Sequence, residues 1–372
     1  MTSIIYVGMD VHTTNYTLCC YSMEDDRFFA EVQVEPDAKN ILKYLARIEK
    51  QQSRDCRIVC GYEAGCLGYS LYHQLHAHGI DCVILAPTTM MTKPGKRIKT
   101  DRRDARLISK CLAFHTYSPV YIPTEVDDAV KEYIRMRDDA NSALARVKQQ
   151  IIAFCIRHGK IHDGKSYWTN KHLEWLSSLD LGNKILSEVL QEYLIRYYQL
   201  REQVDVYDMR INELAQAEPY RQKVEKLGCF RGIAAHTALS FCVEVGDFRR
   251  FATAQQFASY LGLVPGECSS GDKQQYTGIT KAGNSHLRKL LVETAQVFGR
   301  SATKSGKSVA LKERQAKCDS LTVAYADKAN ARLKKKYFKI AMRSKVNIAK
   351  TAVAREMACF IWGMMTDNIS CA

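Results

Sequence analysis

Residues 4–12 read IIYVGMDVH, an apolar run that carries one carboxylate, Asp10, near its end. Short continuous apolar runs rich in β-branched residues are typical of buried strands. Residues 16–21 form a second apolar run, and residues 28–34 (FFAEVQV) alternate with the period of two that a half-buried strand shows. The sequence therefore predicts three consecutive strands at the start of the chain.

The segments that follow alternate between helix and strand patterns. The predicted elements are a helix at 37–50, a strand at 57–62, a helix at 69–78 and a strand at 82–86. Asp37 directly precedes the apolar face of the first helix, so we expect its carboxylate to cap that helix. Three strands, a helix and then strand–helix–strand indicate an α/β sheet domain.

Two long helices are predicted in the middle of the chain. Apolar residues recur at steps of three and four from Val126 to Phe154, with only Arg137 out of pattern, and again from Leu186 to Leu214. Heptads sustained over this length predict a coiled coil, either between the two helices or with another subunit.

The changes of pattern predict three domains. These are an α/β domain at 1–118, a helical coiled-coil domain at 119–218 and a mostly helical domain at 219–372. The last domain ends with a basic helix, ARLKKKYFKIAMRSK (331–345), and an apolar segment, TAVAREMACFIWGMM (351–365). That segment is shorter than the ~18 apolar residues that a membrane span needs, so we expect it to pack in the core.

Positive charge is concentrated in two stretches of the chain. The 54 Lys and Arg residues exceed the 40 Asp and Glu residues, which gives a net charge of +14. Residues 88–110 hold eight basic and two acidic side chains, and residues 300–350 hold fifteen and three. Such clustering indicates a polyanionic partner, and we expect nucleic acid; a solvated basic face is the alternative.

The N-terminus, MTSIIYVGMD, lacks the charged and then apolar pattern of a signal peptide, and no membrane span is predicted. The 14 cysteines are scattered without a CxxC pair. This usage is typical of reduced thiols rather than of a disulfide framework. We therefore expect a cytoplasmic protein with no membrane partner.

Four carboxylates are the candidate catalytic groups. Asp10 lies inside an apolar strand, and Glu63 ends another (RIVCGYEAG). Asp101 and Asp104, in KTDRRDARLISK, would project from one face of a helix. A buried carboxylate needs a partner, a metal or an edge position, and an all-oxygen site suits Mg²⁺ or Mn²⁺. We therefore expect these side chains to converge on divalent ions, as a pair ~3.5–4 Å apart. Alternatively, Asp10 lies at an edge and Asp101 caps its helix with help from Asp104.

Linked motifs in both halves of the chain resemble one family. The motifs are GMDVH (8–12), GYEAGCLGYSLYHQLHAHGIDCVILAP (61–87), PGKRIKTDRRDARLIS (94–109), FCVEVGDFRRFATAQQFASYLGLVPGECSSG (241–271), GITKAGNSHLRKLLVETA (278–295) and KYFKIAMRSKVNIAKTAVAREMACFIWGMM (336–365). Together they are similar to the DEDD-type transposases of bacterial insertion sequences, the IS one-ten family and within it the IS eleven-eleven group. Piv-type DNA invertases are relatives of that family.

The resemblance implies a specific fold and chemistry. The N-terminal domain is expected to have a RuvC-like, ribonuclease-H-type fold, with Asp10, Glu63, Asp101 and Asp104 as its metal-binding DEDD residues. The nucleophile is expected at Ser270, before Gly271, with Ser269 as the alternative. The resemblance also implies a covalent serine–DNA intermediate formed within a tetramer. It further implies a bridge RNA that pairs with target and donor DNA.

Basic residues near these motifs are the predicted nucleic-acid contacts. One group flanks the acidic residues: Lys93, Lys96, Arg97, Lys99, Arg102, Arg103 and Arg106. A second group lies near the end of the chain: Lys334, Lys335, Lys336, Lys339, Arg343 and Lys345. Lys281 and Arg288, near the serine in sequence, could hold the scissile phosphate. Contacts of this kind weaken steeply with salt.

The resulting prediction is a Mg²⁺- or Mn²⁺-dependent, RNA-guided DNA transposase that acts on double-stranded donor and target DNA. We expect it to act in the bacterial nucleoid as a homo-oligomer, either a dimer or a tetramer. Two alternatives stay open. One is a RuvC-like nuclease or invertase that uses water and no guide RNA, with Ser270 merely structural. The other is a degenerate protein that binds RNA or DNA without cutting it.

Overall fold

The computed structural model describes residues 3–52, 56–65, 67–90, 100–267, 275–300 and 306–369. The chain divides into two compact units, 1–122 and 123–372. The first unit combines a sheet with helices, and the second is mostly helical.

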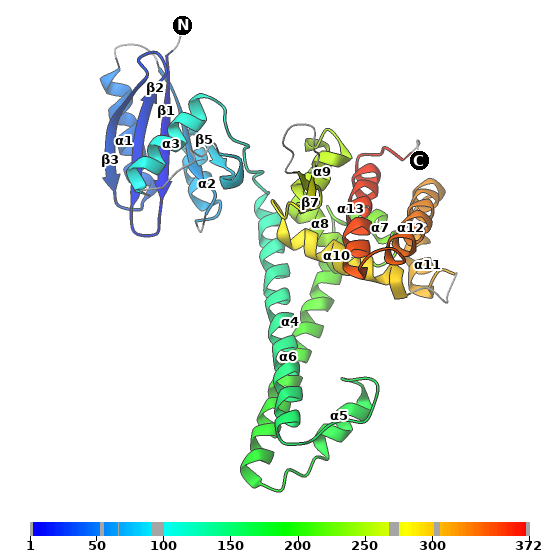
Figure 1. Ribbon diagram of the computed structural model, residues 1–372. Helices are drawn as coiled ribbons and strands as arrows, with labels where there is room; N and C mark the ends of the chain where they lie inside the picture. The colour runs from blue at the N-terminus through cyan, green and yellow to red at the C-terminus, as the bar shows by residue number, and fades with distance from the viewer. Residues whose placement is uncertain are drawn as a thin grey trace. The chain divides into compact units, whose positions relative to one another are not determined.

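The N-terminal unit is built on a five-stranded sheet in the order β3-β2-β1-β4-β5 (Figure 1). The strands are β1 (Ser3–Val11), β2 (Tyr16–Ser22), β3 (Arg27–Val34), β4 (Cys56–Glu63) and β5 (Asp81–Leu85). The first three strands are antiparallel neighbours, whereas β4 runs parallel to both β1 and β5. The predicted α/β sheet domain that begins with three consecutive strands is therefore confirmed.

Helices cover both faces of this sheet. They are α1 (Ala38–Gln51), α2 (Ser70–Ala77) and α3 (Asp101–Ala113), and a 3-10 turn, η1 (Pro87–Thr89), follows β5. Alternate residues of β1, including Val7 and Met9, pack in a core with α1 and α2, whereas Tyr6 packs in a second core with α3. Asp37 caps α1 as predicted, since its side chain accepts a hydrogen bond from the Lys39 amide.

Glycine at position 8 allows α3 to lie directly on β1. A Cβ atom at Gly8 would lie 2.0 Å from the Ala105 carbonyl oxygen and 2.4 Å from the Ser109 amide nitrogen. Such distances are far below van der Waals contact, so any side chain here would push the helix away from the strand. The N-terminal end of α3 is thereby held close to the end of β1.

The second unit begins with two long helices, α4 (Glu125–Arg157) and α6 (Lys184–Gln216), which pack along one another (Figure 1). Residues of the predicted apolar pattern, such as Leu144 and Leu190, are buried between them. Val126, the first residue of that pattern, is 61% exposed, so the buried seam begins only at Val130. A short helix, α5 (Asn170–Ser177), lies in the connection.

Arg137 interrupts the apolar pattern because it makes a polar contact between the two helices. Its guanidinium donates two hydrogen bonds to Asp208 on α6, at 2.7 and 3.0 Å. A paired, bidentate charge is a stable way to place an arginine at a largely buried position.

A helical core completes the second unit. Its elements are α7 (Arg221–Gly228), α8 (Ala235–Val245), η2 (Phe248–Arg250), α9 (Ala254–Tyr260), β6 (Pro265–Glu267), β7 (Tyr276–Ile279), α10 (Ser285–Arg300), α11 (Val309–Gln315), α12 (Ser320–Ala341) and α13 (Val346–Met365). α13 packs against α9, α10 and α12, and Val353, Met357 and Ile361 are fully buried on it. The apolar segment at 351–365 is therefore a core helix, as predicted. Among the described helices, none has both the length and the apolar character needed to cross a bilayer.

Candidate active site

Asp10 lies at the end of β1, on the face of the sheet that α3 covers. Side chains alternate along a strand, so Asp10 shares a face with Tyr6 and Gly8, which both meet α3. The Asp10 side chain is only 14% exposed. The carboxylate is therefore partly withdrawn from water next to the helix.

Glu63 is the register neighbour of Asp10 on the adjacent strand. β1 and β4 are parallel and pair Met9 with Tyr62, so the next residues along each strand, Asp10 and Glu63, lie side by side. Tyr62 packs in the core with α1 and α2, which leaves Glu63 on the α3 side, the same side as Asp10. The exposed Glu63 thus lies at the same edge of the sheet.

The start of α3 brings two further carboxylates to this edge. Thr100 is the N-cap, and its side chain accepts a hydrogen bond from the Arg103 amide. The alternative in which Asp101 caps this helix is therefore wrong. Asp101 and Asp104 occupy the first turn, where the exposed amide groups and the helix dipole stabilise negative charge.

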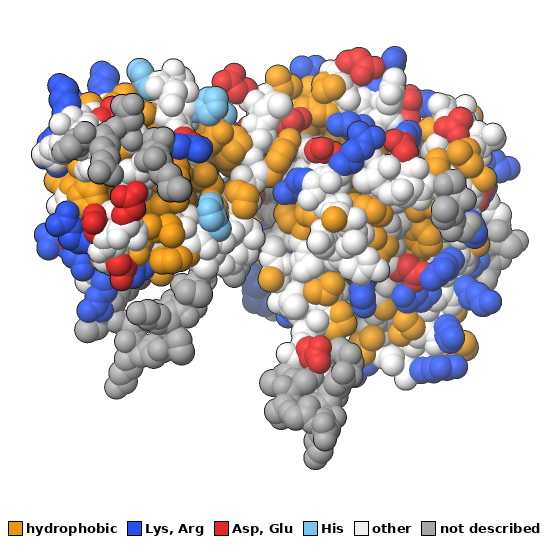
Figure 2. Space-filling model, turned by 90° about the horizontal axis from the view of Figure 1, so that it is seen from above, with side chains coloured by type: hydrophobic (Ala, Val, Ile, Leu, Met, Phe, Trp, Pro, Cys, Tyr) orange, Lys and Arg blue, Asp and Glu red, His pale blue; other side chains and the backbone are white. Residues whose placement is uncertain are grey.

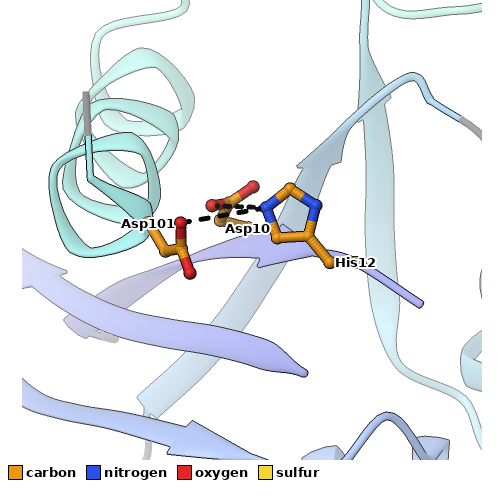
Figure 3. Close-up of side chains that lie close together, drawn as sticks. All are labelled: Asp10, His12 and Asp101. Atoms are coloured by element: carbon orange, nitrogen blue, oxygen red, sulfur yellow. Dashed lines mark ion pairs between the residues drawn. The ribbon is translucent and has the colours of Figure 1, made fainter. Parts of the chain in front are cut away.

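Asp10, Asp101 and His12 form a cluster (Figure 3). One ligand atom from each residue lies within 4.8 Å of the others. His12 Nε2 is 3.2 Å from Asp10 Oδ2 and 4.0 Å from Asp101 Oδ1. Glu63 and Asp104 are not part of this close triad, although Asp104 is near enough for its charge to act on Asp10.

Sequence reasoning missed His12, but the spacing held the signal. On a strand, residues two apart point to the same side, and His12 follows Asp10 by two in GMDVH. The histidine ends up beside the carboxylate although it lies just beyond β1.

The charge balance at Asp10 favours an external cation. Burial raises the pKa of this carboxyl, the nearby His12 ring opposes the shift, and the charges of Asp104 and Asp101 add to it. Asp10 Oδ2 is buried and accepts no hydrogen bond of acceptable geometry within the described residues. Buried carboxylate oxygens normally have such partners. The cluster therefore fits a divalent cation, which carboxylate and imidazole groups can bind.

Ser270, the predicted nucleophile, and Ser269, its alternative, both lie outside the described residues. The described strands on either side, β6 and β7, pair antiparallel, with Pro265 opposite Ile279. The Thr280 amide donates to the Val264 carbonyl at 2.9 Å, which extends this pairing.

The two cations predicted near the serine differ in their surroundings. Lys281 is exposed and has a positive φ of 57°. Arg288 is half-buried, and its guanidinium donates to the carbonyl oxygens of Leu261 at 2.9 Å and Ala282 at 3.4 Å. Arg288 therefore ties together the two ends of the segment that contains β6 and β7.

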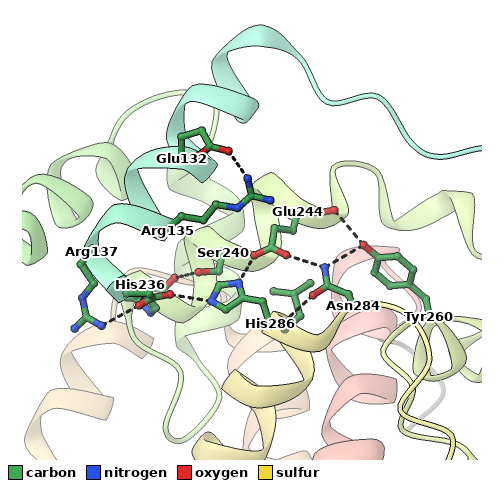
Figure 4. Close-up of polar contacts among 11 residues, drawn as sticks. Glu132, Arg135, Arg137, His236, Ser240, Glu244, Tyr260, Asn284 and His286 are labelled. Carbon is green, nitrogen blue, oxygen red and sulfur yellow. Dashed lines mark hydrogen bonds and ion pairs between the residues drawn. The ribbon is translucent and has the colours of Figure 1, made fainter. Parts of the chain in front are cut away.

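A polar network in the second unit, centred on His286, also escaped sequence reasoning (Figure 4). His286 Nε2 is 2.9 Å from Asp138 Oδ2, and His286 Nδ1 hydrogen-bonds Glu244 Oε1. Asp138 also receives contacts from His236 at 3.0 Å and Arg137 at 3.1 Å. The network therefore links α4, α8 and α10.

The same network reaches the segment that contains β6 and β7. Asn284 donates to Glu244 Oε2 at 2.7 Å and to the Tyr260 hydroxyl at 3.3 Å. Its own side-chain oxygen accepts from the Leu287 amide at 2.9 Å, so Asn284 also caps α10. The residues on both sides of that segment are thus fixed to buried polar groups.

We expect the stability of the second unit to fall as pH rises through the titration of His286. Burial would lower the pKa of His286, but hydrogen bonds to Asp138 and Glu244 raise it from 6.5 to about 9. The folded protein therefore holds a proton that the unfolded chain releases near pH 6.5. Below pH 6.5 this proton should add on the order of 3 kcal/mol to the free energy of unfolding, and this contribution should be lost by about pH 9.

Urea unfolding at a series of pH values measures this loss, and His286→Gln should flatten the profile over the same range. The exposed His78, at the end of α2, supplies the control variant His78→Asn. A profile for His286→Gln that still falls between pH 6.5 and 9 would contradict the assignment.

The predicted basic contacts lie on several elements. Lys93, Lys96, Arg97 and Lys99 lie outside the described residues. Arg102 and Arg106 on α3 pair with Glu31, at 3.3 and 2.6 Å. Lys335, Lys339, Arg343 and Lys345 are exposed on or just after α12, whereas Lys334 and Lys336 are half-buried.

Lys336 pairs with Glu356 at 2.6 Å. On the face of the second unit shown in Figure 2, Lys and Arg side chains are dispersed rather than gathered in one patch.

Comparison with known proteins matches both halves of the chain to transposases. Residues 225–314 match the family described as "Transposase IS116/IS110/IS902 family", and residues 7–156 match the model of DEDD transposases of the IS110 type, described as "Transposase". The "Putative transposase y4qE" of Sinorhizobium fredii is 35% identical over 307 residues, which cover 82% of this chain and 75% of that protein.

Two named insertion-sequence transposases are also similar. The "Transposase for insertion sequence element IS1533" of Leptospira borgpetersenii is 32% identical over 340 residues, 90% of this chain and 95% of that protein. The "Transposase for insertion sequence element IS1111A" of Coxiella burnetii is 26% identical over 268 residues, 68% of this chain and 71% of that protein. This chain therefore belongs to the IS110/IS116 family of DEDD transposases, the enzymes that cut and rejoin DNA when an insertion sequence moves.

Proposed function

We propose that this transposase cuts and rejoins DNA through a covalent bond between Ser270 and a DNA phosphate, assisted by a divalent metal ion at Asp10, Glu63, Asp101 and Asp104. A RuvC-like fold of the N-terminal unit is part of this proposal. The observation that carries it is the cluster at the end of β1, where Asp10 Oδ2 is buried without a hydrogen-bond partner among the described residues and Asp101 lies close by.

The acidic residues would hold Mg²⁺ or Mn²⁺. When bound there, the ion supplies positive charge that stabilises the phosphate during attack and displacement. Asp10 and Asp101 would be its carboxylate ligands in the close cluster, while Glu63 lies on the same face of the sheet and Asp104 lies in the first turn of α3.

The proposed covalent step begins on Ser270. Its hydroxyl oxygen forms a bond to phosphorus, and the phosphorus–oxygen bond to one DNA end breaks. The serine gives up its proton, and the departing DNA oxygen takes one up to become a hydroxyl. Attack by a DNA hydroxyl on the serine phosphodiester reverses the chemistry and rejoins the strand. An ester intermediate conserves the bond energy that hydrolysis by water would discard.

Nucleic acid would be held by the basic residues of both units. We assign double-stranded donor and target DNA, together with a structured guide RNA that pairs with both, as partners. The proposed contacts are Lys93, Lys96, Arg97, Lys99, Arg102, Arg103, Arg106, Lys281, Arg288, Lys334, Lys335, Lys336, Lys339, Arg343 and Lys345. We further propose that the protein acts in the nucleoid as a homo-oligomer, either a dimer or a tetramer. Its functional domains would be 1–118, 119–218 and 219–372. α4 and α6 would form its coiled coil.

Trapping the covalent intermediate tests the nucleophile. Full-length protein, its copurified RNA and end-labelled donor DNA should give a protein–DNA adduct on a denaturing gel, and Ser270→Ala should abolish it. Ser269→Ala is the matched control, because the adjacent hydroxyl is removed while Ser270 remains. Loss of the adduct only in Ser269→Ala would move the role to Ser269. Metal-dependent cleavage without an adduct in any variant would instead favour water as the nucleophile.

A further inference from the structure

His12 occupies a position that the four-carboxylate picture leaves unexplained. Its side chain is 47% exposed, and its Nε2 atom faces both Asp10 and Asp101 (Figure 3). Each of the three residues offers one possible ligand atom, and these atoms lie within 4.8 Å of one another. The ligand atoms gathered here are therefore two oxygens and one nitrogen.

The spacing of these atoms matches ligands around one small divalent ion. With metal–ligand bonds of about 2.1 Å, two ligands at right angles lie about 3 Å apart and two on opposite sides about 4 Å apart. His12 Nε2 lies 3.2 Å from Asp10 Oδ2 and 4.0 Å from Asp101 Oδ1. Both separations fall in this range.

A simple ion pair between His12 and Asp10 accounts less well for the arrangement. Asp10 Oδ2 lies 3.2 Å from the imidazole nitrogen, yet it accepts no hydrogen bond of acceptable geometry among the described residues. A pair without a well-aligned donor gains little. Two ligand atoms that bind the same cation, in contrast, direct their lone pairs at the cation. They therefore need no hydrogen-bond alignment with one another.

We propose that His12 binds the metal ion of this site through Nε2, so that the site holds the ion by mixed nitrogen and oxygen ligands and prefers Mn²⁺ to Mg²⁺. This inference rests on the metal site of the proposed function. Mg²⁺ favours oxygen ligands and octahedral geometry with retained waters. An imidazole ligand raises affinity for transition-metal ions such as Mn²⁺ more than for Mg²⁺.

Pulsed electron paramagnetic resonance of Mn²⁺ tests the bond directly. Full-length protein loaded with Mn²⁺ alone, without DNA, should show spin-echo modulation from an imidazole nitrogen, and His12→Asn should remove it. His12→Gln is a second variant should the first be unstable, and His78→Asn, which changes an exposed histidine of the same unit, should leave the modulation unchanged.

Competition measurements supply a second readout. His12→Asn should weaken Mn²⁺ binding at least about tenfold, while the affinity for Mg²⁺ changes much less, so the ratio of the two affinities falls. Mn²⁺ that binds the wild type with an unchanged ratio and no nitrogen modulation would overturn the role of His12 while leaving the carboxylate site intact. Mn²⁺ that binds equally to wild type and to Asp10→Asn would instead overturn the metal site of the proposed function.

Discussion

Replacing Asp10 with asparagine should lower the rate of DNA cleavage at least about a thousandfold and also raise the free energy of unfolding by about 1 kcal/mol. The rate falls because the amide cannot supply the negative charge that holds a divalent ion, and a loss of about 4 kcal/mol at the transition state corresponds to that factor. Stability rises because burial of the carboxylate raises its pKa and the charges of Asp104 and Asp101 add to the effect, which the His12 ring offsets only in part.

Donor-DNA cleavage and urea unfolding, measured on the same preparation, separate the two effects. Glu49→Gln is the matched control, since Glu49 is an exposed carboxylate on α1 and should leave both quantities unchanged. A variant that is both inactive and strongly destabilised would show that Asp10 serves the fold. Full cleavage activity in the variant would show that the acidic cluster takes no part in the chemistry.

Replacing Gly8 with alanine should destabilise the N-terminal unit by about 3 kcal/mol or more and abolish metal binding. The new Cβ would lie 2.0 Å from the Ala105 carbonyl oxygen and 2.4 Å from the Ser109 amide nitrogen, both backbone atoms of α3. Backbone cannot rotate aside as a flexible side chain can, so the helix must move. Its first turn carries Asp101, and any displacement separates that carboxylate from Asp10.

Gly65→Ala provides the control for this substitution. At Gly65 the nearest atom to a new Cβ is the Glu63 carbonyl oxygen at 3.8 Å, an ordinary contact. Thermal unfolding and Mn²⁺ binding should therefore be nearly unchanged in Gly65→Ala and strongly impaired in Gly8→Ala. Near-native Mn²⁺ affinity in a folded Gly8→Ala protein would show that the close approach of α3 to β1 is dispensable for the site.

Local patterns were sufficient to predict much of the first unit. Apolar runs and alternation located the leading strands, and Asp37 was recognised as a cap because capping depends on residues only two or three apart. The α3 cap was misjudged in one alternative, since Thr100 and Asp101 are both good capping residues and only backbone geometry distinguishes them.

Local sequence patterns could not predict contacts between residues that are far apart in the chain. Arg137 was noted only as an interruption, because its partner Asp208 is 71 residues away in the chain. His286 and Asp138 are 148 residues apart, and nothing in either local sequence indicates that they meet. The proposed role of Ser270 came from family resemblance alone, since a serine before a glycine is by itself an ordinary turn.

The close packing of α3 on β1 has a consequence for how the N-terminal unit loses its order. Among the described residues, the carboxylates of the cluster are shared between the central strand and the helix packed on it, so we expect them to separate only when that packing opens. In hydrogen-exchange experiments the amides of β1 and α3 should become exchangeable together, in one sub-global event. On gradual heating, cation release should then coincide with melting of the whole unit rather than precede it.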